Sequence, residues 1–178
     1  MTQPDYRGRT AELLRRASQR VTAECKAMHA QHAAKGALQS GATMVRAVEI
    51  WSEISSEHLK IALAEFGATI ETRGREWKRA MRGAQGALNG HSAAASELLE
   101  PSFRLANPPG GTDGAAYRAA DDRISAAHEK MTLIISDFRD GWTAPRAKKW
   151  NERNPLAFAL LMAGVGALLA TAARLLFK

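Results

Sequence analysis

The sequence predicts an all-α protein in which long amphipathic helices, forming a hairpin or a coiled-coil-like bundle, precede one C-terminal transmembrane helix. Apolar residues recur every three or four positions over long stretches, and no stretch shows the sustained alternation of a strand. A long uncharged apolar segment follows residue 154. The expected parts are a helical region (1–100), a Pro/Gly linker (101–114), an amphipathic heptad helix (115–140), a basic juxtamembrane segment (141–154) and a transmembrane anchor (155–177).

The first predicted helix begins at Asp5 or Thr10 and ends at Lys35. Its apolar residues share one face but are sparse. Gly36 is a natural stop, because glycine readily takes the left-handed conformation that ends many helices. We expect this helix to pack as a third member beside two longer helices.

Three possible metal ligands lie on the first helix. Cys25, His29 and His32 fall at i, i+4 and i+7, so they point the same way. A thiolate and two imidazoles suit zinc or copper, but a fourth ligand and a supporting shell are not visible. The sequence therefore favours a buried Cys25 flanked by histidines, keeps a metal site as the weaker alternative, and predicts no cofactor.

The second predicted helix has the clearest apolar stripe, which repeats every 11 residues at about 3.67 residues per turn. The stripe consists of Met44, Val48, Trp51, Ser55, Leu59, Ala62, Phe66, Ile70, Arg73, Trp77, Met81, Ala84 and Leu88. All of its members except Ser55 and Arg73 are apolar. Unbroken, this helix would be about 65 Å long. Four glycines at 67, 74, 83 and 86 weaken it, so packing along the stripe must offset their effect.

The linker over 101–114 contains three prolines and a Gly-Gly pair, and we expect no regular structure there. A third helix follows, from about Gly114 to Asp140. Its heptad seam is Tyr117, Ala120, Ile124, Ala127, Met131, Ile134 and Phe138. The second and third helices are expected to fold back on each other as an antiparallel intrachain pair that also self-associates. Pairing of the seams between chains is the alternative.

A basic cluster lies within the second predicted helix. Arg75, Lys78, Arg79 and Arg82 fall at i, i+3, i+4 and i+7, on a face roughly opposite Trp77. This face is interpreted as an ordinary solvated surface, as a contact with anionic lipid, or as a nucleic-acid contact. No nucleic-acid motif accompanies it, so the third interpretation depends on charge alone.

A second basic cluster precedes the apolar segment and is formed by Arg146, Lys148, Lys149 and Arg153. The excess of positive charge on this side predicts that the N-terminal part lies in the cytoplasm. The same side chains favour anionic lipid. Trp150, and also Trp142, is expected at the level of the lipid head groups, where an amphipathic ring is stable.

The apolar segment itself predicts a single membrane span. Residues 155–173 carry no charge, and as a helix they come close to the ~30 Å hydrocarbon core of a bilayer. Small residues allow close packing of such helices, here Ala159, Ala163, Gly166, Ala167 and Ala170. The charged N-terminus does not resemble a signal peptide, and one cysteine fits a reducing compartment. We therefore expect a tail-anchored protein of the bacterial inner membrane, with its N-terminus in the cytoplasm.

No spacing of serine, histidine and aspartate suggests a nucleophile, and no phosphate-binding loop is present. The sequence therefore predicts a non-enzymatic, oligomerising scaffold or adaptor that holds an unknown protein partner at the cytoplasmic membrane face, on anionic lipid. One alternative is a membrane-active, lysis- or toxin-like protein whose anchor oligomerises. Another is a membrane-tethered nucleic-acid binder that uses the basic face of residues 75–82.

Overall fold

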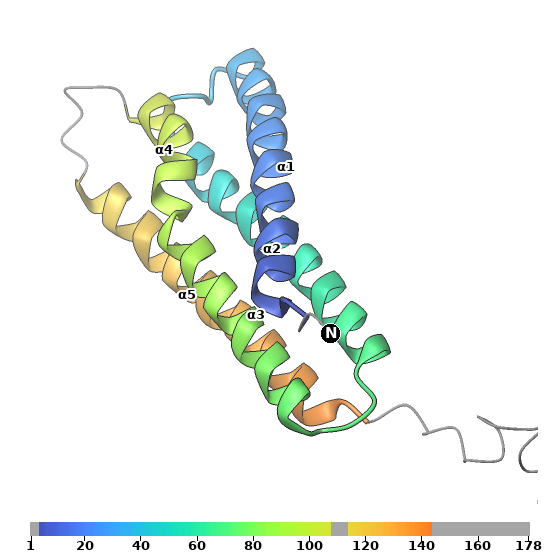
Figure 1. Cartoon of the computed structure of the whole chain (residues 1–178). Coiled ribbons are helices and arrows are strands. Elements are labelled where there is room, and N and C mark those ends of the chain that lie inside the picture. Colours follow the sequence, from blue (N-terminus) through green and yellow to red (C-terminus); the bar gives the residue numbers. More distant parts are fainter. Residues whose placement is uncertain (1–3, 108–113, 144–178) are drawn as a thin grey trace, which may run out of the picture. The chain divides into compact units, whose positions relative to one another are not determined.

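The computed structural model describes residues 4–107 and 114–143. These residues form five helices and no strand: α1 (Tyr6–Ala34), α2 (Gly41–Thr69), α3 (Arg75–Ala93), α4 (Ala95–Ala106) and α5 (Gly114–Gly141), as Figure 1 shows. The all-α prediction is thereby confirmed. None of the helices in this described part is long and apolar enough to cross a membrane. The predicted anchor over 155–177 lies outside the described residues.

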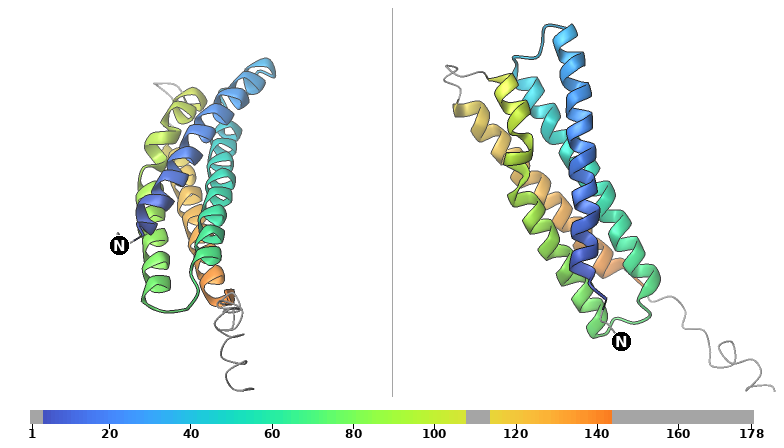
Figure 2. Two further views of the ribbon diagram at one scale, coloured as in Figure 1. Left: turned by 45° about the vertical axis from the view of Figure 1, so that its right-hand side comes forward. Right: turned by 45° about the horizontal axis from the view of Figure 1, so that its top comes forward.

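The helices pack side by side with alternating directions. α3 and α4 follow one another through Ala94 and form a single bent column beside α1, α2 and α5 (Figures 1 and 2). The chain ascends α1 in Figure 1, descends α2, ascends α3 and α4, and descends α5. α1 packs on α2 and α3, and α5 packs on the same two helices from their other side. The apolar stripes of all five helices meet in one core.

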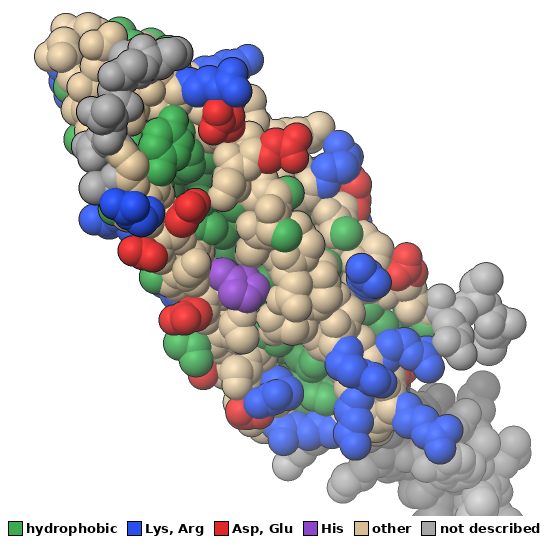
Figure 3. Space-filling model, turned by 90° about the vertical axis from the view of Figure 1, so that its left-hand side faces the viewer, with side chains coloured by type: hydrophobic (Ala, Val, Ile, Leu, Met, Phe, Trp, Pro, Cys, Tyr) green, Lys and Arg blue, Asp and Glu red, His purple; other side chains and the backbone are tan. Residues whose placement is uncertain are grey.

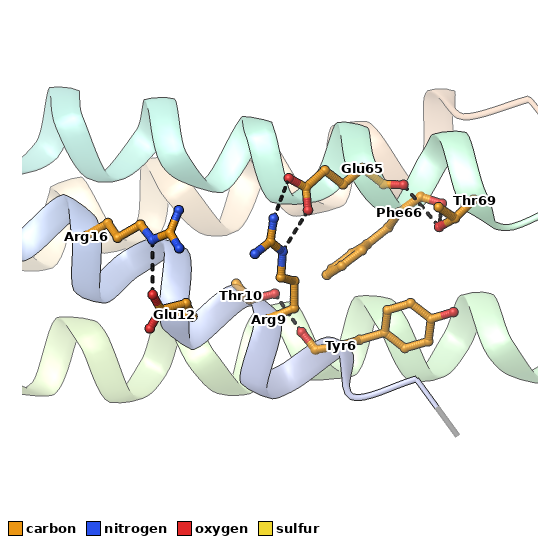
Figure 4. Close-up of polar contacts among 8 residues, drawn as sticks. All are labelled: Tyr6, Arg9, Thr10, Glu12, Arg16, Glu65, Phe66 and Thr69. Atoms are coloured by element: carbon orange, nitrogen blue, oxygen red, sulfur yellow. Dashed lines mark hydrogen bonds and ion pairs between the residues drawn. The ribbon is translucent and has the colours of Figure 1, made fainter. Parts of the chain in front are cut away.

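The start of α1 is fixed against the end of α2 (Figure 4). Asp5 caps α1 by accepting a hydrogen bond from the Gly8 N–H at 2.8 Å. The Tyr6 ring meets the buried Phe66 ring edge to face, with centroids 5.0 Å apart. Arg9 binds Glu65 through two 2.9 Å contacts. Because Arg9 and Glu65 are about half exposed, the aromatic contact contributes more to stability than this ion pair does.

The expectation of one continuous second helix was wrong. α2 ends at Thr69 and α3 begins at Arg75, and the chain reverses direction between them. Ile70 takes extended backbone geometry and is 1% exposed, so the turn itself contributes a core residue. Every member of the stripe except Arg73 is buried. Folding back brings both halves of the stripe into one core, where each packs mainly against α1 and α5.

The expectation that residues 101–114 have no regular structure was also wrong for residues 101–106. α4 continues through Pro101 to Ala106. Proline removes a backbone donor and disfavours a helix interior. Here the ring of Pro101 is exposed, while Leu99 and Phe103 on the opposite face are buried in the core. Tertiary packing therefore overrides the local signal, and the rest of the predicted linker, 108–113, lies outside the described residues.

The first and third predicted helices agree closely with α1 and α5. Gly36 follows α1 with φ at 66°, the left-handed geometry that its position predicted. On α5 the seam residues Ala120, Ile124, Ala127 and Met131 are buried, but Ile135 rather than Ile134 is the next core residue. The seams are thus filled within one chain, as the intrachain expectation held. The expected antiparallel direction applies only to α3, because α5 runs antiparallel to α3 and in the same direction as α2 (Figure 1).

Candidate functional site

The four predicted basic residues lie in the first eight residues of α3, and the side chains of Arg75, Lys78, Arg79 and Arg82 are all exposed. The N-terminus of a helix carries partial positive charge, so cations there oppose the helix dipole. Gly74 precedes α3 and has no side chain to cap it. The arrangement works against local stability, which is a common property of functional surfaces.

The single acidic residue in this part of α3 is held by another element. Tyr6 donates a short hydrogen bond from its hydroxyl to Glu76. Burial, together with this bond and the negative charge of Glu76, raises the pKa of Tyr6 to about 12. The contact fixes the start of α1 beside the basic residues.

Basic side chains gather toward one end of the face shown in Figure 3, around hydrophobic atoms. A hollow of about 520 Å³ lies there between α3 and α5, which we call the α3–α5 groove. It is lined by the apolar residues Trp77, Met81 and Ile135, by the cations Lys78, Arg82 and Arg139, and by Gln85. None of these described lining residues is acidic. The groove thus combines an apolar floor with a positively charged rim.

A second hollow flanks the same basic residues on the side of α1. It is lined by Pro4, Asp5, Tyr6, Arg7, Arg79, Arg82 and Gly83. Arg82 lines both hollows and therefore lies between them. The positive charge of this end is therefore spread over α1, α3 and α5.

The end of α5 is packed against the same part of α3, in what we call the Trp142 junction (Trp142, Trp77, Gly67 and Arg73). The Trp142 and Trp77 rings stack with centroids 4.1 Å apart and planes 20° apart. The Trp142 Nε1–H donates to the Gly67 carbonyl at 3.2 Å. The Arg73 guanidinium donates to the carbonyls of Asp140, at 2.9 Å, and of Trp142. The last described residue, Thr143, therefore lies beside the beginning of α3.

This junction corrects the expectation that Trp142 lies among lipid head groups. Its side chain is only 9% exposed and belongs to the core. Its sequence position suggested a membrane interface because a basic segment and an apolar segment follow. The structure shows instead that the ring completes an aromatic cluster with Trp77 and Phe138.

The other predicted basic and packing residues lie outside the described part of the chain. They are Arg146, Lys148, Lys149 and Arg153 of the juxtamembrane segment, and Ala159, Ala163, Gly166, Ala167 and Ala170 of the apolar segment. Their roles stay predictions.

The three possible metal ligands of α1 bond to two hydroxyl groups on two other helices. His29 shares a 2.9 Å hydrogen bond with Ser102 of α4, and Cys25 also bonds to Ser102. His32 bonds instead to the Thr43 hydroxyl of α2 at 2.8 Å. Burial raises the pKa of the Cys25 thiol. Among the described residues, no three side chains of His, Cys, Asp or Glu gather as a metal site.

A buried polar cluster around His91 was not predicted. The Nε2 atom of His91 accepts a 3.1 Å hydrogen bond from the Trp51 indole N–H and lies 2.8 Å from the Ser55 hydroxyl. An indole N–H can only donate, so this Nε2 is unprotonated. Burial, with a smaller contribution from nearby His58, lowers the pKa of His91 to about 4. Ser55 is fully buried, and the cluster ties α2 to the end of α3.

One signal for this cluster was present in the sequence. Ser55 and Arg73 are the two polar members of the long apolar stripe. In the structure both are anchors: Ser55 bonds to His91, and Arg73 binds carbonyls at the end of α5. Each polar residue in the stripe therefore marked a hydrogen bond between segments remote in sequence, with Ser55 buried in the core and Arg73 exposed in the turn before α3.

Comparison with known proteins does not place the chain in a family. The chain matches no protein-family model, no curated protein and no solved structure at a significant level.

Proposed function

We propose that this chain is a non-enzymatic scaffold or adaptor that holds a partner at a cytoplasmic membrane face, with the basic end of its bundle on anionic lipid. The main support is that the four cations of α3 and the point where α5 leaves the bundle lie together. Trp142 stacks on Trp77, which stands between Arg75 and Lys78 in the chain. The next residues in sequence add another basic cluster and then the apolar segment.

This juxtaposition has a direct electrostatic consequence. Each basic side chain near an anionic surface contributes about 1 kcal/mol, so the α3 residues and the segment over 146–153 together supply several kcal/mol. A chain that enters a bilayer after residue 154 brings the basic end of the bundle close to that bilayer. Lipid attraction then orients the bundle and leaves its other surfaces facing the cytoplasm, where a partner can bind.

A different part of the described surface carries exposed acids, which anionic lipid would repel. A carboxylate row on α2, formed by Glu49, Glu53 and Glu57, is exposed. Arg46 of α2 and Arg20 of α1 form ion pairs with this row. In the proposal, the bundle presents this face away from the membrane, and the small residues of the apolar segment supply self-association.

A triple variant, Arg75→Gln/Lys78→Gln/Arg82→Gln, tests the lipid contact in residues 1–153, because the described bundle closes its own core. We expect its affinity for vesicles containing phosphatidylserine to fall on the order of a hundredfold at low salt, from about 1 kcal/mol per lost cation. Its melting temperature should stay equal or rise slightly, because first-turn cations oppose the helix dipole. Vesicle sedimentation and thermal melting measure the two effects.

The matched control removes three exposed cations from α5 (Arg118→Gln/Arg123→Gln/Lys130→Gln), and it should keep most of the vesicle affinity. Equal losses in both variants would show that net charge alone matters and would contradict the proposal. Salt-sensitive binding of duplex DNA or RNA through Arg75, Lys78 and Arg82, without vesicle binding, would replace it with a nucleic-acid function.

A further inference from the structure

We infer that the α3–α5 groove binds one anionic phospholipid molecule, with the phosphate at its basic rim and part of an acyl chain against its apolar floor. This inference rests on the proposed function and names the ligand that the basic end recognises. It makes the contact with the membrane a specific site in addition to a general attraction between opposite charges.

The floor of the groove supplies the apolar half of this site. Trp77, Met81 and Ile135 line it and belong to the hydrophobic core of the bundle. Trp77 is held rigidly, because it contacts both Phe138 and Trp142. An acyl chain laid over these side chains would extend an existing core outward, which is favourable because it removes apolar surface from water.

The rim supplies the charged half. Lys78 and Arg82 are one turn apart on α3, so their side chains neighbour each other on the helix surface. Arg139 of α5 also lines the groove, but it is paired with Asp140 at 2.9 Å, which offsets part of its charge. Lys78 and Arg82 are therefore the main phosphate-binding groups, and the guanidinium geometry of Arg82 matches phosphate oxygens.

The distribution of charge also argues against a different occupant of the groove and against a different hollow as the lipid site. The chain's own segment over 146–153 carries four cations and one acid, so it does not complement a positive rim. A hollow of comparable size, about 430 Å³, lies between α1 and α2. It is lined by both cations and acids, among them Arg46 and Glu53, which pair with each other. Because its cations and acids offset each other, that hollow offers no net attraction to an anion and serves as an internal control.

The test uses the full chain and phosphatidylcholine vesicles that contain a small share of phosphatidic acid with a photoactivatable group on its acyl chain. We expect cross-links in residues 77–85 and 131–139, mapped by mass spectrometry, in addition to any in the apolar segment. The same group on phosphatidylcholine should not label these two segments. Gln85→Trp fills the groove and keeps every cation, so the two sets of cross-links should be lost while sedimentation with anionic vesicles is retained.

Gln31→Trp, which fills the α1–α2 hollow, should change neither result. If Gln85→Trp lowers the melting temperature, the exposed-residue variant Lys78→Gln/Arg82→Gln replaces it, and it too should lose the labelling. Labelling of 77–85 and 131–139 that survives both variants, or that equals labelling by phosphatidylcholine, overturns the groove while leaving the proposed function intact. Absence of any preference for anionic vesicles in residues 1–153 would overturn the proposed function, and the lipid site with it.

Discussion

Acidification from about pH 6.5 to about pH 4 is expected to lower the free energy of unfolding by roughly 3 kcal/mol through His91 alone. In the folded chain the pKa of His91 is lowered to about 4, because burial disfavours the charged ring and nearby His58 adds a smaller contribution. In the unfolded chain the ring has its ordinary pKa near 6.5. Between these values only the unfolded chain binds the proton. The stability from neutral His91 is therefore complete above about pH 6.5 and is lost as the pH falls toward 4.

Urea denaturation at about pH 7 and about pH 4.5 measures this effect in residues 1–153, with His91→Phe as the test variant. We expect His91→Phe to be less stable than the natural chain at neutral pH, by about 1–3 kcal/mol, because the buried Trp51 N–H and Ser55 hydroxyl lose their acceptor. Its stability should depend much less on acid. His128→Phe replaces a half-buried histidine bonded to Ser92 and should keep the natural dependence. Parallel acid profiles for His91→Phe and the natural chain would contradict the assignment.

Trp142→Ala is expected to destabilise the bundle by about 3–5 kcal/mol, the usual result of removing a large buried aromatic side chain. The variant loses the stack on Trp77 and the hydrogen bond to the Gly67 carbonyl. Trp142→Phe keeps a ring over Trp77, so its free energy of unfolding should lie between that of the natural chain and that of Trp142→Ala. Urea denaturation measures the loss, and hydrogen exchange should show faster opening of residues 136–141 at the end of α5.

Gly67→Ala provides an independent test of the same junction. A Cβ atom at this position would lie 2.9 Å from Phe138 Cζ and 2.9 Å from Trp142 Nε1, so these rings must move. In the Trp142→Ala background part of this clash is removed, and the loss caused by Gly67→Ala should be smaller. Strictly additive losses in the double-mutant cycle would show that the two residues do not interact as described.

Local patterns predicted α1 and α5 well, because each is one uninterrupted amphipathic helix with a clear end. They also predicted which side chains of the long stripe are buried. They could not predict the reversal at residues 70–74, because Ile70 keeps its place in the stripe while its backbone becomes extended. Similarly, Pro101 indicated a break, but packing of Leu99 and Phe103 keeps α4 helical. Both failures are cases in which tertiary contacts outweigh local preference.

The candidate site was only partly visible in the sequence. The spacing of Arg75, Lys78, Arg79 and Arg82 gave a basic face directly. Its position beside the end of α5 depends on the stack between Trp142 and Trp77, two residues 65 positions apart (142 minus 77), which no local pattern reports. The groove likewise needs Ile135 and Arg139 from a helix remote in sequence.

We propose that the basic end of the bundle faces the membrane, and fluorescence quenching can test this orientation. In a Cys25→Ser background, a fluorophore is attached to Thr72→Cys, in the turn beside α3, or to Gln39→Cys, in the turn between α1 and α2. These turns lie at opposite ends of α2, roughly 40 Å apart at 1.5 Å per residue. With the full chain on vesicles containing phosphatidylserine and spin-labelled lipid, we expect strong quenching at position 72 and little at position 39. Equal quenching at both positions, or stronger quenching at position 39, would contradict the claim.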